Sequence, residues 1–570
     1  MENDNQFNAK LQSQRELILN AQKKGKMATA GAYMRLSGPG WLQSALTLGG
    51  GSLASSMYLG VIGGLAFLWL QPFAMFLGVI MMSAIAYVTL SMGKRPLRAI
   101  NSEISPVLGW GWLLASMMAN LVWSMPQFAL ATAAIEQNLF TPLFEGRDPF
   151  TNKLIIAPII LLITISIVSI YNIGGRGVKV FETLMKLMVA CVVLCFMGVV
   201  GLLFANGGVE LSDVLNGFKP SLKTLFEPSD SFMALIKDFS PAGKEFWSTL
   251  IVGEQRDVML AAAATAVGIN MTFLLPYSML RKGWDRDFRG LAIFDLSTGL
   301  FIPFILGTGC VVIAASSQFH AKPVLGLASP AYEANGTQIQ PPKNLVVAYD
   351  VLLQKRVKAE VGEQKYAALN DAQKDQLAKA LPENERQIAS MLVKRDAFNL
   401  SSTLAPLVGE KVARYVFGFG VLAMALNATT MLMLINGLCF CELLNKPAKG
   451  KWQTIGSLIV CIGILMPFFW KDALMYLAVP TSVFAMVLLP IAYTCFCLMM
   501  NNKNILGKDM PRGISRIVWN ILMGLAVLTS GSASLYILWS KQGVLGICLF
   551  ALFVLLVAGY RFVKKPASGK

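Results

Sequence analysis

Long apolar runs alternate with short polar segments along nearly the whole chain. Each run holds about 20 predominantly apolar residues, the length at which an α-helix crosses the hydrocarbon core of a bilayer. The pattern therefore predicts an all-α polytopic membrane protein with about 12 transmembrane helices. The expected spans cover residues 41–63, 65–92, 109–135, 154–171, 180–204, 257–280, 290–315, 413–438, 453–470, 473–500, 517–539 and 543–562.

Two long polar segments separate these spans into groups. The segment 316–412 contains helical runs divided by Pro382 and by Asn and Gly turns, and it is too long for a simple connector, so we expect a helical outer cap insertion. The predicted organisation is a cytoplasmic arm 1–40, helices 1–5 in 41–204, an outer loop 205–256, helices 6–7 in 257–315, the cap 316–412, helices 8–12 in 413–562 and a cytoplasmic tail 563–570.

Lysine and arginine residues lie at the ends of the spans and set the expected orientation. Basic residues of the arm and of alternate short loops fall on one side, which is the cytoplasmic side by the positive-inside rule. The pattern predicts a multi-pass protein of the cell membrane with both termini in the cytoplasm and the cap outside. The loops around spans 9–12 do not all alternate cleanly.

Composition narrows the function. The chain is 55% hydrophobic and 14% charged, and its formal net charge of +17 comes from basic residues in short loops, so we expect the lipid bilayer as partner and no nucleic acid. The nine cysteines lie within or at the ends of apolar spans and are interpreted as reduced packing residues. Catalytic residue groupings and cofactor motifs are absent from the sequence, so we expect neither an enzyme nor a cofactor. We expect a monomer, with an oligomer left open.

Span 1 carries a run of small residues, Gly49-Gly50-Gly51-Ser52. Successive glycines weaken an α-helix, so the helix is expected to unwind there. Within a bilayer, the freed backbone groups must face protein, water or a ligand, because lipid offers them no hydrogen bonds. The alternative is that the small residues let a neighbouring helix pack closely.

Span 6 has a second cluster of helix-weakening and polar residues, five spans after the first. It contains Gly268, Ile269, Asn270, Thr272 and Pro276 near its middle. Interrupted helices at corresponding positions of two halves are typical of inverted-repeat secondary transporters, whose substrate site lies between them. We therefore predict a 5+5 repeat. The predicted substrate-binding residues from the two helices are Gly49, Gly50, Gly51, Ser52, Ile269, Asn270 and Thr272.

Several stretches resemble one transporter family. The sequence Leu36-Ser37-Gly38-Pro39-Gly40-Trp41 is similar to the Gly-Pro-Gly opening of the natural-resistance-associated macrophage protein (Nramp) transporters of divalent metals. The resemblance implies a LeuT-type fold with interrupted helices 1 and 6, and a small-molecule or ion substrate. Further similar stretches, in the family's order and spacing, are 58–69, 403–409, 417–423, 484–487 and 504–507.

The chain departs from the family at the residues that the resemblance assigns to the metal and the proton. Gly49 to Ser52 stand where the family has Asp-Pro-Gly-Asn, and Thr272-Phe273-Leu274 align with its Met-Pro-His. Pro126 and Ala129 align with the acidic residues of helix 3. The helix 10 glutamine falls near Thr481, which completes the predicted site, and the sole histidine, His320, falls at the start of the cap.

These departures predict a site of neutral oxygens, which does not favour a dehydrated transition metal. A hard or hydrated cation such as Mg²⁺ remains compatible, since it keeps its water and accepts oxygen ligands. We therefore expect Mg²⁺ in preference to Mn²⁺ or Fe²⁺, without the usual proton coupling. The alternatives are a small neutral or zwitterionic organic solute, held at a half-helix N-terminus, and a non-transporting sensor or scaffold on the same fold.

Two acidic residues within spans are possible coupling groups. Asp295 lies near the cytoplasmic start of span 7 and Glu136 closes span 3 at its outer end. Ionisable residues within a membrane span are often functional. The alternatives are a helix-end carboxylate stabilised by the helix dipole for Asp295 and an interfacial carboxylate for Glu136.

Overall fold

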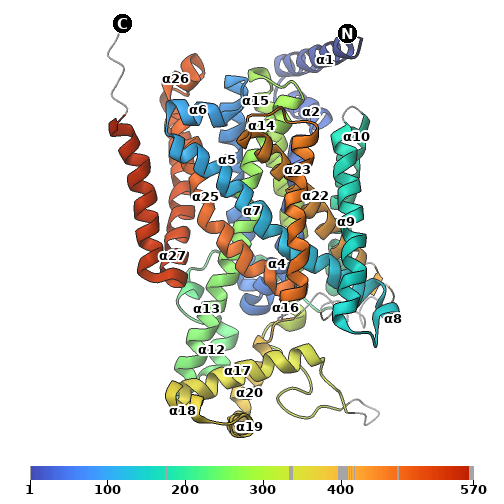
Figure 1. Ribbon diagram of the computed structural model, residues 1–570, viewed down its shortest axis with the longest axis vertical. Helices are drawn as coiled ribbons and strands as arrows, with labels where there is room; N and C mark the ends of the chain where they lie inside the picture. Colours follow the sequence, from blue (N-terminus) through green and yellow to red (C-terminus); the bar gives the residue numbers. More distant parts are fainter. Residues whose placement is uncertain are drawn as a thin grey trace.

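The computed structural model describes residues 2–173, 176–332, 338–395, 417–470 and 474–563, together with Asn399, Gly409, Lys411, Arg414 and Tyr415. Long helices run roughly parallel through the middle of the molecule, and a group of short helices covers one end (Figure 1). The resemblance that rests on residues 403–408 lies outside the described residues, as does most of the expected tail. The all-α fold class is confirmed.

The first five membrane-crossing segments form one half of the bundle. The first of them is divided into two half-helices. In order they are α3 (Pro39–Thr47) with α4 (Gly50–Gly63), α5 (Leu70–Met92), α7 (Pro106–Ala133), α9 (Pro149–Ile173) and α10 (Arg176–Ala205).

The next five segments repeat this order, again with a divided first member. They are α13 (Pro241–Ala266) with α14 (Ile269–Arg281), α15 (Arg289–Asp295) with α16 (Phe301–Phe319), α22 (Phe417–Leu443), α23 (Lys451–Ile459) with α24 (Met466–Phe469), and α25 (Ala478–Met500). The last element, α27 (Gly513–Val563), follows them.

Ten segments of the described chain are long and apolar enough to cross a membrane. Two of the expected spans, 517–539 and 543–562, both lie in α27, which is continuous apart from a bend. It bends back at Gly543 (φ 60°, ψ −139°), a conformation that glycine adopts without steric cost. The expected span 180–204 corresponds to α10, of which only Phe196–Ala205 is a continuous apolar stretch of described residues.

The two divided helices occupy the centre of the bundle. In the most apolar windows of Gly50–Phe67 and Pro241–Arg281, 89% of the residues are buried, against 28% in Pro149–Tyr171 and 6% in Gly513–Tyr560. α4 packs against α13, while α27 lies at the edge of the bundle (Figure 1). Both helix interruptions are therefore surrounded by protein, as their free backbone groups require.

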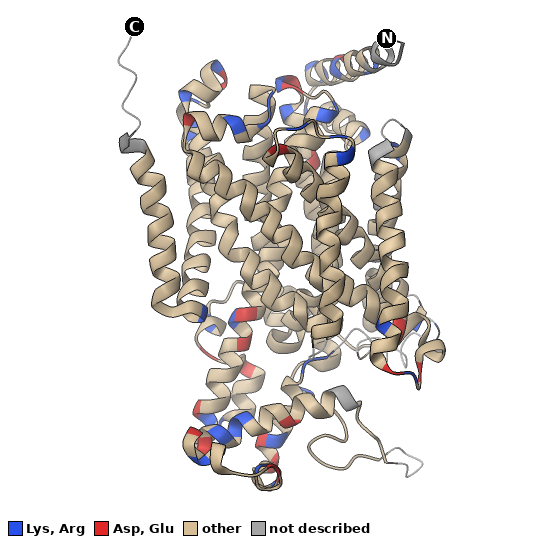
Figure 2. Ribbon diagram, viewed as in Figure 1, with Lys and Arg blue, Asp and Glu red and all other residues tan. Residues whose placement is uncertain are grey.

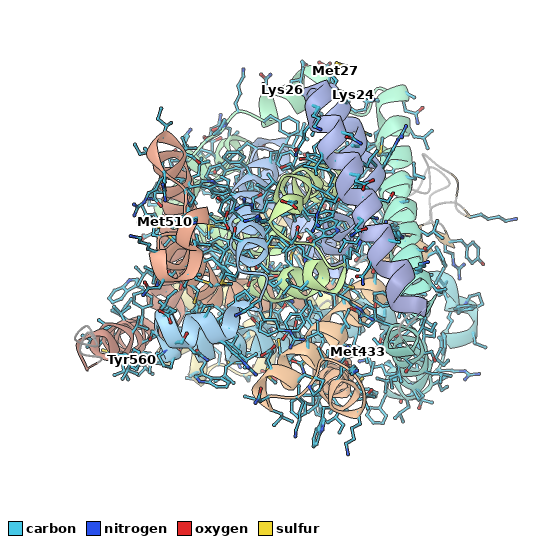
Figure 3. The ribbon with its side chains drawn as sticks, turned by 90° about the horizontal axis from the view of Figure 1, so that it is seen from above. Lys24, Lys26, Met27, Met433, Met510 and Tyr560 are labelled. Atoms are coloured by element: carbon cyan, nitrogen blue, oxygen red, sulfur yellow. The ribbon has the colours of Figure 1, made fainter. Side chains whose placement is uncertain are left out.

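Charged residues gather at the two ends of the bundle, and the middle band is almost free of them (Figure 2). α1 (Glu2–Lys24) and α2 (Lys26–Leu36) lie at the end opposite the short helices. Viewed onto that end, α1 runs over the bundle toward one edge of the molecule, where Lys24 and Lys26 lie (Figure 3). Arg15 pairs with Asp285 and, at 3.1 Å, with Asp287, which anchors α1 to the turn after α14.

The opposite end carries the outer segments. The expected loop 205–256 contains α11 (Leu211–Gly217) and α12 (Asp230–Ile236), and from Pro241 onward it is the start of α13. The polar residues of 241–256 fit a helix because this part of α13 extends beyond the apolar band toward the cap. The cap itself contains α17 (Lys343–Val361), α18 (Glu363–Ala368), α19 (Asp371–Ala380) and α20 (Glu383–Leu392).

The cap is joined to the bundle by polar contacts close to helix 1. The Trp247 indole N–H of α13 donates to Glu385 at 2.9 Å. Lys394 pairs with Glu254 of α13, and the Tyr58 hydroxyl of α4 donates to the Arg395 carbonyl at 2.5 Å. The cap therefore contacts both divided helices on their outer sides.

Pro126 does not interrupt helix 3, although proline weakens a helix. α7 continues through Pro126 to Ala133. Proline removes a single backbone hydrogen bond from a helix, and in membranes neighbouring helices commonly stabilise such a position. Pro126 is buried among them.

The orientation can be tested by labelling cysteines from outside intact cells. We expect Gln364→Cys in α18 to be labelled by a membrane-impermeant maleimide and Arg512→Cys to be protected, because positively charged loops stay inside. Both positions are exposed. The unsubstituted chain measures background labelling of its own cysteines. Labelling of Arg512→Cys with protection of Gln364→Cys would reverse the orientation.

Candidate functional site

The break in helix 1 is shorter than the glycine run suggests. α3 ends at Thr47, Leu48 (φ −84°, ψ 49°) and Gly49 (φ −94°, ψ 178°) are not helical, and α4 begins at Gly50. Gly50, Gly51 and Ser52 therefore form the first turn of α4. The helix resumes at once because its first N–H groups find acceptors: the Gly50 N–H donates to Gln127 Oε1 at 2.8 Å.

The break in helix 6 precedes the polar residues expected to form it. α13 ends at Ala266, Val267 (φ −142°, ψ 113°) and Gly268 (φ −85°, ψ 157°) are extended, and α14 begins at Ile269. Asn270, Thr272 and Pro276 are thus inside α14. The extended pair leaves two helix ends facing each other next to the break in helix 1.

A small cavity lies between the two breaks, with a volume of about 30 Å³. Each of the two divided helices contributes residues from around its break, and α7 and α22 complete the wall. Helix 1 contributes Leu46, Thr47, Gly49, Gly51 and Ser52, and helix 6 contributes Thr265, Gly268 and Met271. The remaining lining residues are Trp123 and Gln127 of α7 and Ala428 and Leu432 of α22. A volume of about 10–15 Å³ accommodates one water-sized sphere, so this cavity holds roughly two.

Gln127 is the polar residue of the site that sequence reasoning missed. It lies in α7 between Pro126 and Ala129, the two positions aligned with acidic residues, and its side chain is buried. Its amide oxygen accepts the Gly50 N–H, and the residue lines the cavity. An amide in an otherwise apolar span could have identified it, because polar groups within a bilayer need a partner.

Met271 corrects the expectation of a site with oxygen donors alone. Its sulfur lies 3.4 Å from both the Thr47 hydroxyl oxygen and the Gly268 backbone nitrogen, and it accepts a hydrogen bond from the Gly268 N–H. The single Thr47 hydroxyl proton is donated to the closer Gln43 carbonyl at 3.0 Å. The alignment placed the family's methionine at Thr272, one residue later. A soft donor is therefore present in the cavity wall, and it lies close to both breaks.

Five predicted site residues do not line the cavity, namely Gly50, Ile269, Asn270, Thr272 and Thr481. Asn270 donates to Asn120 Oδ1 at 3.0 Å, and Thr272 accepts from the Trp112 indole at 2.8 Å while donating to the Ile269 carbonyl. These bonds hold the start of α14 against α7. Thr481 donates to the carbonyl of Leu477 at 2.8 Å within its own segment.

The residue after Thr481 is closer to the cavity. Ser482 is fully buried, and its hydroxyl has no hydrogen-bond partner among the described residues. A Cβ at Gly51 would lie 3.9 Å from that hydroxyl oxygen. Ser482 is therefore the part of α25 that approaches the break in helix 1.

The two acidic residues lie outside the cavity wall. Asp295 accepts from Ser37 Oγ and from the backbone N–H groups of Gly38 at 3.0 Å and Gly40 at 2.5 Å. It therefore caps the positive N-terminus of α3, a neighbouring half-helix, rather than the start of its own helix. Glu136 accepts from Asn152 at 2.9 Å.

His320 and the other potential metal ligands do not assemble near the breaks. His320 directly follows α16, its Nδ1 lies 3.0 Å from the Val61 carbonyl oxygen, and burial lowers its pKa. Within the described part of the chain, no group of three or more His, Cys, Asp or Glu residues is placed to hold a metal ion. Any ion in the cavity would meet neutral ligands.

Comparison with solved structures identifies the fold. The manganese transporter of Eremococcus coleocola, in complex with an aromatic bis-isothiourea substituted compound, superposes with a TM-score of 0.59 at 14% identity, covering 93% of each chain. A glutamate-to-alanine variant of that transporter gives 0.59 at 13% identity, covering 93% of this chain and 94% of that one. A histidine-to-alanine variant gives 0.55 at 14%, with the same coverage. The fold is thus the LeuT-type 5+5 repeat.

Comparison with family models gives the membership. No curated protein matches the sequence. The model described as natural resistance-associated macrophage protein-like matches residues 40–334 and 378–561, which is most of the chain. Within the cap, residues 335–377 are not matched by the model. The chain belongs to the Nramp family of membrane transporters.

Proposed function

We propose that this protein carries a divalent metal cation through the cavity between its two helix breaks, with Mg²⁺ favoured over Mn²⁺ and Fe²⁺ and without the usual proton coupling. Family membership supports a divalent metal, and the similar structures are of a manganese transporter. The observation that carries the preference is the cavity wall, which contains no carboxylate and no imidazole among its described residues.

The ligands at the cavity favour a hard cation. Gln127, Ser52 and Thr47 supply amide, hydroxyl and backbone oxygens, which suit Mg²⁺ or Ca²⁺ more than a transition metal. The sulfur of Met271 is the exception, and it already accepts a hydrogen bond from the Gly268 N–H. A transition metal would have to displace this hydrogen bond without gaining an anionic ligand.

The size of the cavity supports a cation that keeps part of its water. A space of about 30 Å³ accommodates roughly two water-sized spheres. Mg²⁺ dehydrates reluctantly and is often held through its bound waters. The half-helices must therefore move apart to admit a largely hydrated ion, as alternating access around a central site requires.

The positions of the acidic residues support transport without the usual proton coupling. The carboxylate of Asp295 is occupied by the N-terminus of α3, and Glu136 lies at the outer end of helix 3. Both possible coupling groups thus have structural partners away from the cavity. A proton carrier next to the ion is missing from the described cavity wall.

A second candidate substrate is a small zwitterionic solute. The N-termini of α4 and α14 both begin beside the cavity, and such ends attract carboxylates. Support for it is weaker, because Gly50 N–H is bonded to Gln127 and the cavity in this conformation has no room for an organic molecule.

The function is tested in liposomes that contain the purified protein, a metal-sensitive dye and a pH dye. We expect saturable Mg²⁺ uptake with no change in internal pH, and weak Mn²⁺ uptake. Protein-free liposomes measure the leak. High-affinity Mn²⁺ uptake with internal acidification would contradict the proposal, and no flux of any metal would favour the organic solute or a non-transporting role.

A further inference from the structure

A second and much larger cavity opens between α5, α13, α25 and α27. Its volume is about 400 Å³, and its wall is predominantly apolar. Several large side chains at its edge are exposed, among them Phe226 (73%), Phe73 (38%) and Tyr536 (37%). Since α27 lies at the edge of the bundle, we interpret this cavity as open toward the bilayer (Figure 1).

The cavity follows α13 from its charged outer part to its break. Its wall along this helix runs from Arg256 to the break in helix 6 and includes Met259, Leu260, Ala263 and Val267. Eleven residues of α-helix span about 16 Å, which is close to half of the ~30 Å hydrocarbon core. The cavity therefore has the depth of one leaflet, the outer one in the orientation given above.

Arg256 places a positive charge at the outer end of this apolar space. Its Nε donates to the Leu225 carbonyl at 2.6 Å and one terminal nitrogen donates to the Tyr536 hydroxyl at 3.2 Å. These bonds hold the guanidinium at the cavity mouth. The other terminal nitrogen has no hydrogen bond with any described residue, and a guanidinium suits phosphate oxygens well.

We propose that this cavity binds one phospholipid of the outer leaflet, with an acyl chain along α13 and its phosphate at Arg256. The apolar wall, the depth of one leaflet and the cation at the interface match the three parts of such a lipid. Binding of the lipid does not depend on which substrate the protein transports.

The inner end of the cavity reaches the break in helix 6. Val267, one of its two extended residues, lines the cavity, and a Cβ at Gly78 of α5 would lie 2.3 Å from Val267 Cγ2. The bound chain therefore contacts the hinge of α13 where it packs tightly against α5. A lipid that fits one arrangement of this hinge better than another shifts the balance between conformations of the substrate site.

The test uses native mass spectrometry of the delipidated full-length protein titrated with phosphatidylglycerol. We expect the unsubstituted protein to bind one lipid tightly. In Arg256→Gln the affinity should be about tenfold lower, because a charge-assisted contact is lost. In Ala263→Trp the tight site should be lost, because the tryptophan fills the cavity. Ala533→Phe fills the cavity from α27 and takes the place of Ala263→Trp in the test if that variant does not fold. Lys365→Gln replaces an exposed cation of α18 in the cap that does not line the cavity, and this variant should bind like the unsubstituted protein.

Unchanged lipid affinity in Arg256→Gln and in a folded cavity-filling variant would overturn the proposal. Equal affinity for a diacylglycerol without phosphate would overturn the role of Arg256. Because lipid binding is measured without transport, its result does not depend on the outcome of the metal flux assay.

Discussion

Replacing Gly49 by valine is expected to abolish transport while leaving a folded protein. A Cβ at this position would lie 2.6 Å from the Ala428 Cβ and 3.1 Å from the Leu46 carbonyl oxygen. Neither atom can move without shifting its backbone. The two further methyl groups of valine would occupy a cavity of only about 30 Å³. Overpacking of this kind costs about 1–3 kcal/mol of unfolding free energy, which most proteins survive.

The Gly49→Val effect is measured as metal flux in liposomes beside the thermal stability of the purified variant. Gly201→Val is the matched control, since a Cβ there meets no atom within 4 Å. It should retain both flux and stability. Normal flux in Gly49→Val would mean that the substrate passes elsewhere.

The second large effect is expected in the cap, at Glu385. Its carboxylate pairs with Arg356 at 2.6 Å and 3.3 Å and accepts from Trp247 at 2.9 Å, and both charged side chains are only 3% exposed. Glu385→Ala leaves the buried guanidinium without its buried partner. The exposed Glu360 still pairs with Arg356 at 2.9 Å and compensates part of its charge, so we expect a destabilisation of about 1–3 kcal/mol from the hydrogen bonds that Arg356 and Trp247 lose. We expect the cap to unfold locally from α13.

Hydrogen exchange of the α17 amides measures the loss of structure in Glu385→Ala. The double variant Arg356→Met with Glu385→Leu should recover much of the protection, because apolar side chains of similar size can replace a buried ion pair. Glu363→Gln removes an exposed partner of Lys358 and should change little. Equal protection in Glu385→Ala and the unsubstituted protein would show that this ion pair does not hold the cap.

The fold could be predicted well from sequence, because a bilayer imposes strong constraints. Apolar runs of bilayer length predicted the membrane helices. Helix-weakening glycines at Gly49 and Gly268 indicated the repeat. The structure has both breaks at corresponding positions of its two halves. The bend at Gly543 also lies between two expected spans, as glycine at a positive φ allows.

The site was harder to predict, because it depends on packing between helices distant in sequence. The exact breaks lie at Leu48–Gly49 and Val267–Gly268, since backbone donors such as Gly50 N–H find partners on α7. Gln127 was missed because alignment by motif identified only its neighbours Pro126 and Ala129. Met271 was missed because the alignment placed the family's methionine at Thr272. The start of α13 at Pro241 was missed, because its outer turns carry polar residues to support the cap.

The most direct test of a cation site at the breaks is the stability of purified protein as a function of Mg²⁺ concentration. A bound ligand raises the apparent melting temperature by mass action. We predict a saturable rise with Mg²⁺ in the unsubstituted protein and in Gly201→Val, a smaller rise with Mn²⁺, and none in Gly49→Val. An equal rise in Gly49→Val would show that the ion binds elsewhere and would contradict this account.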